Sequence, residues 1–191
     1  MRILLCLQAP PALDARARLD RAAYTAWAAQ ALGAQPARMA LLSLAQEAGQ
    51  GATVCCATQP TAVATAQRLY PDRRIEVKTA YNEPDLRVPG LPGRWRPAAW
   101  RSFSLLAWML RPEGGEAAET ARRRVVDCSV RLIGLAKEHD QAVLVAGPVL
   151  LRLMAFKLNG LGFRGPLFND FPVGVPVAYE SDLPSRVPAS A

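Results

Sequence analysis

The chain has 191 residues, 51% of them hydrophobic and 20% charged, which suffices for one well-buried domain and excludes an intrinsically disordered protein. Its net charge of +7 comes from 23 Lys and Arg against 16 Asp and Glu, and the excess is mainly Arg, a bias typical of a GC-rich genome. With one His and four Cys, the chain cannot build a site with two histidines, so we expect no metal site and no cofactor.

The first half of the chain alternates short apolar runs with helical segments. Ile3–Leu7 is a continuous apolar run followed by Pro10 and Pro11, and it predicts a buried strand. We predict further strands over residues 52–56 and 74–78, and helices over residues 17–32, 38–48 and 60–70. Pro at the first position of the third helix and Pro after its end support its bounds.

The second half continues this alternation after a loop over residues 82–97 that carries four prolines. We predict an aromatic helix over residues 98–111, a long helix over residues 116–138 and a further helix over residues 149–159. Ala142–Ala146 predicts a buried strand, and the loose alternation of Val173–Tyr179 predicts a final strand at a sheet edge.

Short apolar strands that alternate with helices are typical of a largely parallel sheet covered on both faces. We therefore predict an α/β fold of three α/β/α layers, with a single domain over residues 1–180 and a polar tail over residues 181–191 that we expect to be disordered. Ligands of such sheets bind outside the carboxyl ends of the strands, which here are followed by Leu7–Pro10, Ala57–Thr61 and Gly147–Val149.

The sequence also bears on the compartment. The apolar run near the start is shorter than the 7–15 residues of a typical signal peptide, and Arg101 and Arg152 interrupt the longest apolar stretches. The four cysteines show no CxxC spacing. We expect a soluble, cytoplasmic protein with reduced thiols.

Five short motifs follow one another along the chain. They are Met1–Cys6, Cys56–Ala62, Gly115–Ala117, Val143–Pro148 and Gly162–Pro166. In their order and spacing they resemble the histidine phosphatase superfamily, the phosphoglycerate-mutase-like proteins. The family counterparts are the first strand, a Ser-Ser-x-x-x-Arg-Ala segment, a Gly-Glu-Ser helix start, Val-Leu-Val-x-His-Gly, and the Gly-Trp-Arg-Gly-Pro turn of one bacterial branch.

The resemblance implies a phosphoryl site of two His and two Arg, with one His as the nucleophile. In this chain these positions fall on Leu7, Gln8, Thr61 and Gly147. Neutral side chains cannot form a phosphohistidine or offset the charge of a phosphate dianion, so essentially nothing of that mechanism should remain. His139 precedes the strand at 142–146 and so lies at the opposite end of the sheet. We therefore expect no phosphatase activity.

Glu83 is the one acid that still matches the family pattern, in which a Glu of this loop is the usual proton donor. If it faces an emptied apolar pocket, desolvation should raise its pKa above about 4.3, which suits general acid/base catalysis on a neutral substrate. The alternative is a loop carboxylate that is solvated or paired with Arg87.

Other candidate residues of this pocket have two interpretations each. Cys6 or Cys56 is either a reactive thiol near the N-terminus of the helix at Pro60 or a small buried hydrophobe. Gln8 and Thr61 either hydrogen-bond a neutral polar ligand or are remnants of an unused site.

Two further groups lie on predicted helices. Trp100 and Trp108 share a face with Phe103, and they form either a lid over an apolar ligand, ordinary core or a partner interface. The triplet at residues 122–124 predicts a solvated helix face with Glu119 and Asp127 in helical reach rather than a nucleic-acid site.

Two functions follow from these observations. The first is a pseudophosphatase that acts as a small-molecule-binding or protein-interaction module, with a neutral or apolar ligand. The second is a repurposed enzyme in which Glu83 moves a proton during isomerisation, cyclisation, elimination or hydrolysis. A closed cavity with Glu83 hydrogen-bonded by Gln8 or Thr61 favours the enzyme, and a site filled by side chains favours the pseudophosphatase. A homo-oligomer stays open, and we expect neither nucleic acid nor membrane as a partner.

Overall fold

A five-stranded sheet forms the centre of the computed structural model, which describes residues 1–37, 51–110, 116–167 and 171–182. The strands are β1 (Arg2–Leu7), β2 (Thr53–Cys56), β3 (Ile75–Val77), β4 (Gln141–Ala146) and β5 (Pro176–Glu180). They lie in the order β3-β2-β4-β1-β5, and all neighbours are parallel except β1 and β5. The predicted parallel arrangement of the three apolar strands is confirmed.

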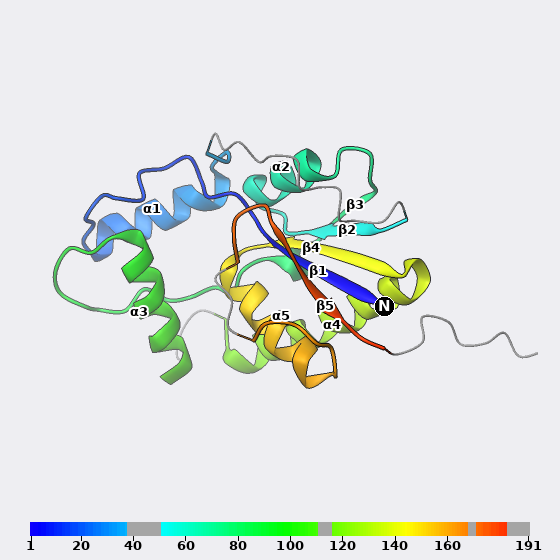
Figure 1. The fold of residues 1–191 in the computed structure, drawn as a ribbon. Coiled ribbons are helices and arrows are strands. Elements are labelled where there is room, and N and C mark those ends of the chain that lie inside the picture. The colour runs from blue at the N-terminus through cyan, green and yellow to red at the C-terminus, as the bar shows by residue number, and fades with distance from the viewer. Residues whose placement is uncertain (38–50, 111–115, 168–170, 183–191) are drawn as a thin grey trace, which may run out of the picture.

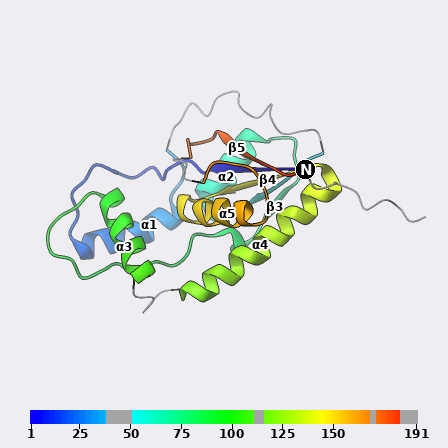
Figure 2. The same cartoon turned by 60° about the horizontal axis from the view of Figure 1, so that its bottom comes forward.

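Helices cover both faces of this sheet and also extend beyond one end of it. They are α1 (Arg21–Gly33), α2 (Pro60–Leu69), α3 (Pro97–Leu110), α4 (Ala118–His139) and α5 (Pro148–Gly160), with a 3-10 turn η2 (Thr79–Tyr81). In Figure 1, α2 lies on one face of the sheet and α4 and α5 lie on the other, and Figure 2 shows α4 and α5 side by side. The fold is thus the three-layer α/β/α arrangement that the sequence predicts.

The core follows from the two most apolar strands. Ile3–Cys6 of β1 and Ala142–Ala146 of β4 are fully buried along their whole length. A strand covered by helices on both faces has no solvent side, so it carries a continuous apolar run instead of an alternating one. Leu132 of α4 and Leu151 of α5 belong to the same buried cluster.

A second, smaller cluster lies beyond the carboxyl ends of the parallel strands, where α1 and α3 sit beside each other (Figure 1). Trp100 of α3 is fully buried, stacks on Tyr24 of α1 at 5.6 Å between ring centroids, and donates its indole N–H to the Leu19 carbonyl at 2.7 Å. Within the described residues, the main hydrophobic cluster includes no residue of α1 or α3. These two helices therefore form a satellite of their own.

Three predicted bounds need correction. The first helix begins at Arg21 rather than residue 17, because Asp20 caps it by accepting the Ala23 N–H at 2.9 Å. The long helix begins at Ala118 rather than residue 116. The last strand begins at Pro176 rather than Val173, because Gly174 takes a positive φ of 69° that breaks the extended run.

Two predictions concern residues that the structure does not describe. They are the helix at residues 38–48 and the part of the predicted tail from residue 183 onward. Among the helices of the described ranges, none is long and apolar enough to cross a membrane.

Candidate functional site

The carboxyl ends of β1, β2 and β4 meet at one edge of the sheet, as the sequence predicts. Leu7 and Ala146 are register partners, and the Gln8 N–H donates to the Ala146 carbonyl at 3.0 Å. The Ala57 N–H donates to the Val145 carbonyl at 3.2 Å, which ties the segment after β2 to the same place. Three segments distant in sequence thus form one site at the strand ends.

The Glu83 side chain reaches into this site and binds the N-terminus of α5. Its Oε1 accepts hydrogen bonds from the backbone N–H groups of Val149 and Leu150, each at 2.9 Å. Pro148 begins the helix and has no N–H group. Gly147, at the N-cap, has no side chain that could accept a hydrogen bond from the N–H groups of the first turn. Glu83 therefore supplies, from another part of the chain, the cap that α5 lacks locally.

The same carboxyl group lies against Gly147, where the resemblance places the family's second His. A Cβ at this glycine would lie 2.5 Å from Cδ and 2.6 Å from Oε1 of Glu83. No side chain fits at position 147 unless Glu83 moves. The space beside Gly147 is filled by a carboxyl group from the loop.

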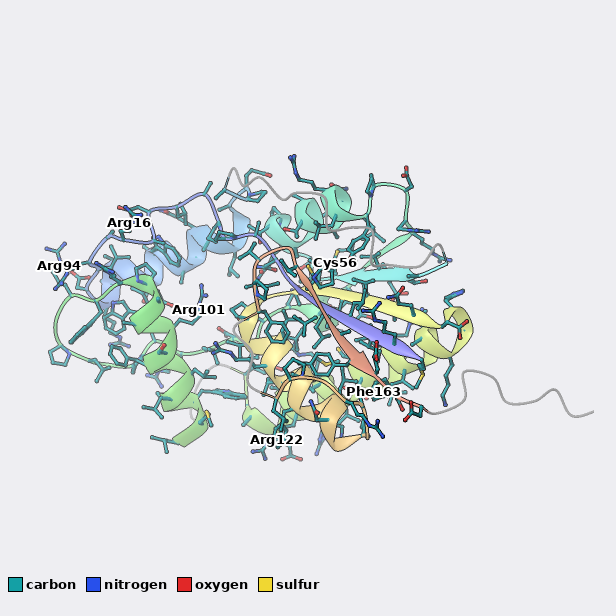
Figure 3. The ribbon with its side chains drawn as sticks, in the orientation of Figure 1. Arg16, Cys56, Arg94, Arg101, Arg122 and Phe163 are labelled. Carbon is teal, nitrogen blue, oxygen red and sulfur yellow. The ribbon has the colours of Figure 1, made fainter. Side chains whose placement is uncertain are left out.

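The electrostatic setting of Glu83 combines burial with opposing interactions. Burial raises the pKa of Glu83, while the hydrogen bond from the Leu150 N–H, the charge of Arg101, the Val149 N–H and the charge of Arg124 all act to lower it. A raised pKa agrees in direction with the sequence-based expectation. Arg101 of α3 and Arg124 of α4 act on Glu83 although they come from elements that local motifs do not connect to it. Figure 3 shows Arg101 on α3.

Two residues that the sequence analysis did not single out for the site hold the loop that carries Glu83. Arg124 donates to the carbonyls of Ala80 at 2.9 Å and Asn82 at 2.5 Å, and it pairs with Glu116 at 2.6 Å. The Asn82 side chain accepts the Thr58 backbone N–H at 2.8 Å, which links this loop to the end of β2. The sequence signals for these contacts are weak: Asn82 is a polar residue next to Glu83, and Glu116 is an acid eight residues before Arg124.

Gln8 and Thr61 lie at the strand ends, but neither bonds to Glu83. The Gln8 amide donates to Gln59 Oε1 at 2.8 Å, and within the described residues its own Oε1 has no hydrogen-bond partner. Thr61 is buried, and its carbonyl accepts the hydroxyl of Thr65 at 2.6 Å. Thr65 in turn accepts the Ala9 N–H at 2.9 Å. These contacts join the segment after β1 to the start of α2.

The thiols are unsuited to nucleophilic chemistry. Cys6 and Cys56 are fully buried, and burial raises the pKa of Cys6 to about 12 and that of Cys56 to about 11. Burial likewise raises the pKa of Cys55 and Cys128 to about 11. At neutral pH, thiols whose pKa lies so far above its ordinary value stay protonated. For Cys6 and Cys56, burial and the raised pKa agree in direction with the interpretation as small buried hydrophobes. Among the described residues, no three His, Cys, Asp or Glu gather closely enough to hold a metal ion.

Trp100 and Trp108, the two tryptophans of the predicted lid, lie in different surroundings. Trp100 packs inside the α1/α3 satellite, whereas Trp108 donates its indole N–H to the Glu116 carbonyl at 2.7 Å and lines a cleft of 910 Å³ between α3, α4 and α5. A second cavity of 470 Å³ lies between α1, α3 and the loop at residues 87–90. None of the residues at the strand ends, Leu7, Gln8, Thr61, Glu83 or Gly147, lines either cavity.

Comparison with known proteins identifies the architecture. No family model and no curated protein sequence matches the chain. Among solved structures, it is similar to the α-ribazole phosphatase of Shigella flexneri (TM-score 0.61, 16% identity, 96% of this chain and 92% of that one). It is also similar to a putative α-ribazole-5'-P phosphatase of Escherichia coli K-12 (TM-score 0.59, 17% identity, 96% and 92%).

A third similar structure is the mycobacterial glucosyl-3-phosphoglycerate phosphatase Rv2419c (TM-score 0.52, 18% identity, 82% of this chain and 78% of that one). At these identities the likeness concerns the fold. The sheet order and the agreement over nearly the whole chain lead to one conclusion: this protein has the histidine-phosphatase, phosphoglycerate-mutase-like fold.

Proposed function

We propose that this protein is a histidine-phosphatase-fold protein without phosphatase activity, which acts as a small-molecule-binding or protein-interaction module. One observation carries the proposal: the Glu83 carboxyl group occupies the space beside Gly147 and accepts both free N–H groups of the first turn of α5. The strand-end site is thus filled by the protein's own side chain.

The charge of that side chain argues against phosphate binding. A helix N-terminus favours one anion through its free N–H groups and its dipole, and here Glu83 already supplies it. A phosphate dianion would have to displace this carboxylate or lie beside it, and like charges in one small site repel each other strongly. The positions of the family's other charged residues, Leu7, Gln8 and Thr61, offer no compensating cation.

The second candidate function, a repurposed enzyme with Glu83 as general acid/base, is favoured by the raised pKa of this residue and by the Gln8 Oε1 that has no partner in the described part of the chain. Against it stands the engagement of Glu83 with two backbone donors rather than with Gln8 or Thr61. We therefore rank the enzyme second.

The test combines turnover and anion binding. Purified protein is assayed with p-nitrophenyl phosphate and with α-ribazole-5'-phosphate, and vanadate binding is followed by ⁵¹V NMR. We expect no turnover above that of a mock preparation and no saturable vanadate binding, because nucleophile and clamp are both absent. Phosphate hydrolysis that survives repurification and disappears in Glu83→Gln would refute the proposal, because it would show a phosphatase in which Glu83 takes part.

A further inference from the structure

The cleft between α3, α4 and α5 is lined by apolar side chains that the rest of the fold leaves exposed. Met109 of α3 and Phe156 of α5 are 68% and 70% exposed, among the highest values for large hydrophobic residues here. Val126 of α4 and Leu167 also line the cleft and are exposed, while Trp108 forms a buried part of its wall. Apolar surface gathered in a concave place marks a binding site more often than scattered exposed residues do.

The polar side chains of this cleft are all cationic. Arg122 of α4 and Arg152 and Lys157 of α5 line it, and no acidic residue of the described chain does. The acids at the start of α4 are engaged elsewhere, because Glu119 pairs with Arg123 at 2.5 Å and Glu116 pairs with Arg124 at 2.6 Å. Within the described residues, the cleft therefore combines an apolar wall with cationic side chains. Figure 3 shows Arg122 at the bottom of the view, below α5.

The dimensions favour a small molecule over a protein. The cleft has a volume of 910 Å³, at the upper end of the roughly 300–1,000 Å³ that is usual for ligand pockets. Within the described residues, its lining comes from α3, α4, α5 and Leu167, so a ligand of this size can contact all three helices.

We propose that this cleft binds a small amphipathic anion, a compound with an alkyl or aromatic body and a single carboxylate or sulfonate head group. The body lies along Met109, Trp108 and Phe156, and the head group lies near Arg122 and Lys157. The proposal goes beyond the function proposed above, because the cleft does not include Glu83 or Gly147 and its ligand is independent of turnover at the strand ends.

The first experiment measures affinity for decanoate by calorimetry on the full chain, below the micellar concentration. We expect a dissociation constant on the order of 10–100 μM. Octanoate should bind more weakly by about two- to fourfold per methylene removed, because less apolar surface is buried. Decanol, which lacks the charge, should bind about five- to thirtyfold more weakly, and decyltrimethylammonium should not bind.

Matched variants locate the site. Arg122→Gln should weaken decanoate binding about three- to fivefold and leave decanol unchanged, whereas Arg123→Gln, one residue along the same helix and outside the cleft, should change neither. Phe156→Ser should weaken both ligands. Val130→Ser removes a comparably exposed hydrophobic residue of α4 outside the cleft and should weaken neither.

Methionine-methyl NMR detects ligand binding in the wild-type protein itself. The chain has four Met, and decanoate should shift the Met109 signal, assigned through Met109→Leu, while the buried Met154 signal stays in place.

Three results would each overturn the proposal. They are equal affinity for decanoate and decyltrimethylammonium, equal effects of the two Arg variants, and an unmoved Met109 signal. A dimer that Phe156→Ser dissociates, with no decanoate binding, would also overturn it and make this face a contact between two copies. Phosphatase assays are not involved, so failure here and failure of the proposed function are separable.

Discussion

The first turn of α5 gives the Glu83 carboxyl group a structural role. Because Pro148 has no N–H, Val149 and Leu150 are the residues whose N–H groups need an acceptor from outside the helix. A single oxygen of Glu83 accepts both hydrogen bonds. A structural role thus accounts for Glu83 without any chemistry, and Gly147 is the residue that leaves room for it.

This coupling predicts the outcome of a double-mutant cycle. Gly147→Ala places a Cβ where Glu83 lies, so Glu83 must leave the helix N-terminus, and we expect a loss of about 1–2 kcal/mol in the free energy of unfolding. Glu83→Ala should lose a similar amount, because the same cap is removed. The double variant should lose little more than Glu83→Ala alone, since the cap can be lost only once.

Chemical denaturation of the wild type and the three variants measures this cycle. Gly160→Ala serves as the control, because a Cβ at Gly160 meets nothing within 4 Å. Additive losses from the two single variants would show that Gly147 and Glu83 act independently, contrary to this interpretation.

The raised pKa of Glu83 makes a prediction about pH. The pKa of this carboxyl group is higher in the folded state than its ordinary value of 4.5, so the group stabilises the folded protein most when it is protonated. That contribution declines as the pH rises past 4.5 and through the higher pKa of the folded state. Relative to Glu83→Gln, the wild type should therefore lose stability as pH rises above 4.5. Urea denaturation of both proteins across this range gives the difference, and a wild type that gains stability relative to the variant would contradict the assigned direction.

At the scale of elements, the three consecutive arginines of α4 have three different surroundings. Arg122 lines the apolar cleft, Arg123 forms an exposed pair with Glu119, and Arg124 holds both Glu116 and the carbonyls of Ala80 and Asn82. Successive side chains on a helix point about 100° apart, so a run of one residue type serves different neighbours. Arg122 and Arg123 are both exposed, as the sequence predicts, whereas Arg124 is half-buried.

Arg124 should therefore matter far more for stability than its neighbour. Arg124→Gln leaves Glu116 without its partner although the Glu116 side chain is only 16% exposed, and we expect a loss of about 2–4 kcal/mol in the free energy of unfolding. Arg123→Gln, the matched control, should lose less than about 0.5 kcal/mol because both members of its pair are exposed. Equal losses in thermal or chemical unfolding would contradict the positioning role of Arg124.

Glu76 connects the edge strand β3 to α4 and predicts a second pH effect. Hydrogen bonds from Arg131 and Lys78 lower the pKa of Glu76 from 4.5 to about 2. A lowered pKa adds stability above pH 4.5 and loses it as pH falls toward 2, so Glu76→Gln should be about 1–2 kcal/mol less stable at pH 7. The deficit should shrink as the pH is lowered below 4.5. Glu138→Gln, at an exposed carboxylate, is the control, and a deficit independent of pH would exclude this pair as its cause.

At the scale of the whole molecule, the sequence predicted what depends on local pattern. β1 and β4 were predictable because a buried parallel strand needs a continuous apolar run, and the strand ends followed from the order of the elements. The contact of Glu83 with Val149 and Leu150 joins residues 66 and 67 positions apart, and no periodicity contains it. The cleft was not predictable for the same reason, since it exists only where three helices converge.

The last motif of the chain shows the difference between a pattern and its cause. Gly162 takes a positive φ of 87° after α5, and a Cβ at Gly165 would collide with the Tyr179 ring, whose hydroxyl donates to the Pro166 carbonyl at 2.7 Å. The resemblance marked this turn, but the positive φ at Gly162 and the packing of Gly165 against Tyr179 of β5 explain why its glycines are needed.

Because α1 and α3 share no part of the main hydrophobic cluster, the molecule should not unfold with uniform resistance. Trp100 anchors the satellite through its stack on Tyr24 and its bond to the Leu19 carbonyl, so Trp100→Leu should increase amide hydrogen exchange in α1 and α3 by about tenfold or more. Exchange in β1 and β4 should change little, because their burial does not depend on this residue. Leu144→Ala, a large-to-small change inside β4, is the matched contrast and should increase exchange across the whole sheet. Hydrogen exchange followed by mass spectrometry resolves these segments. If Trp100→Leu accelerated exchange equally in the sheet and in the satellite, the two clusters would be one cooperative unit, and the cleft between α3 and the other helices would have to open with the whole fold.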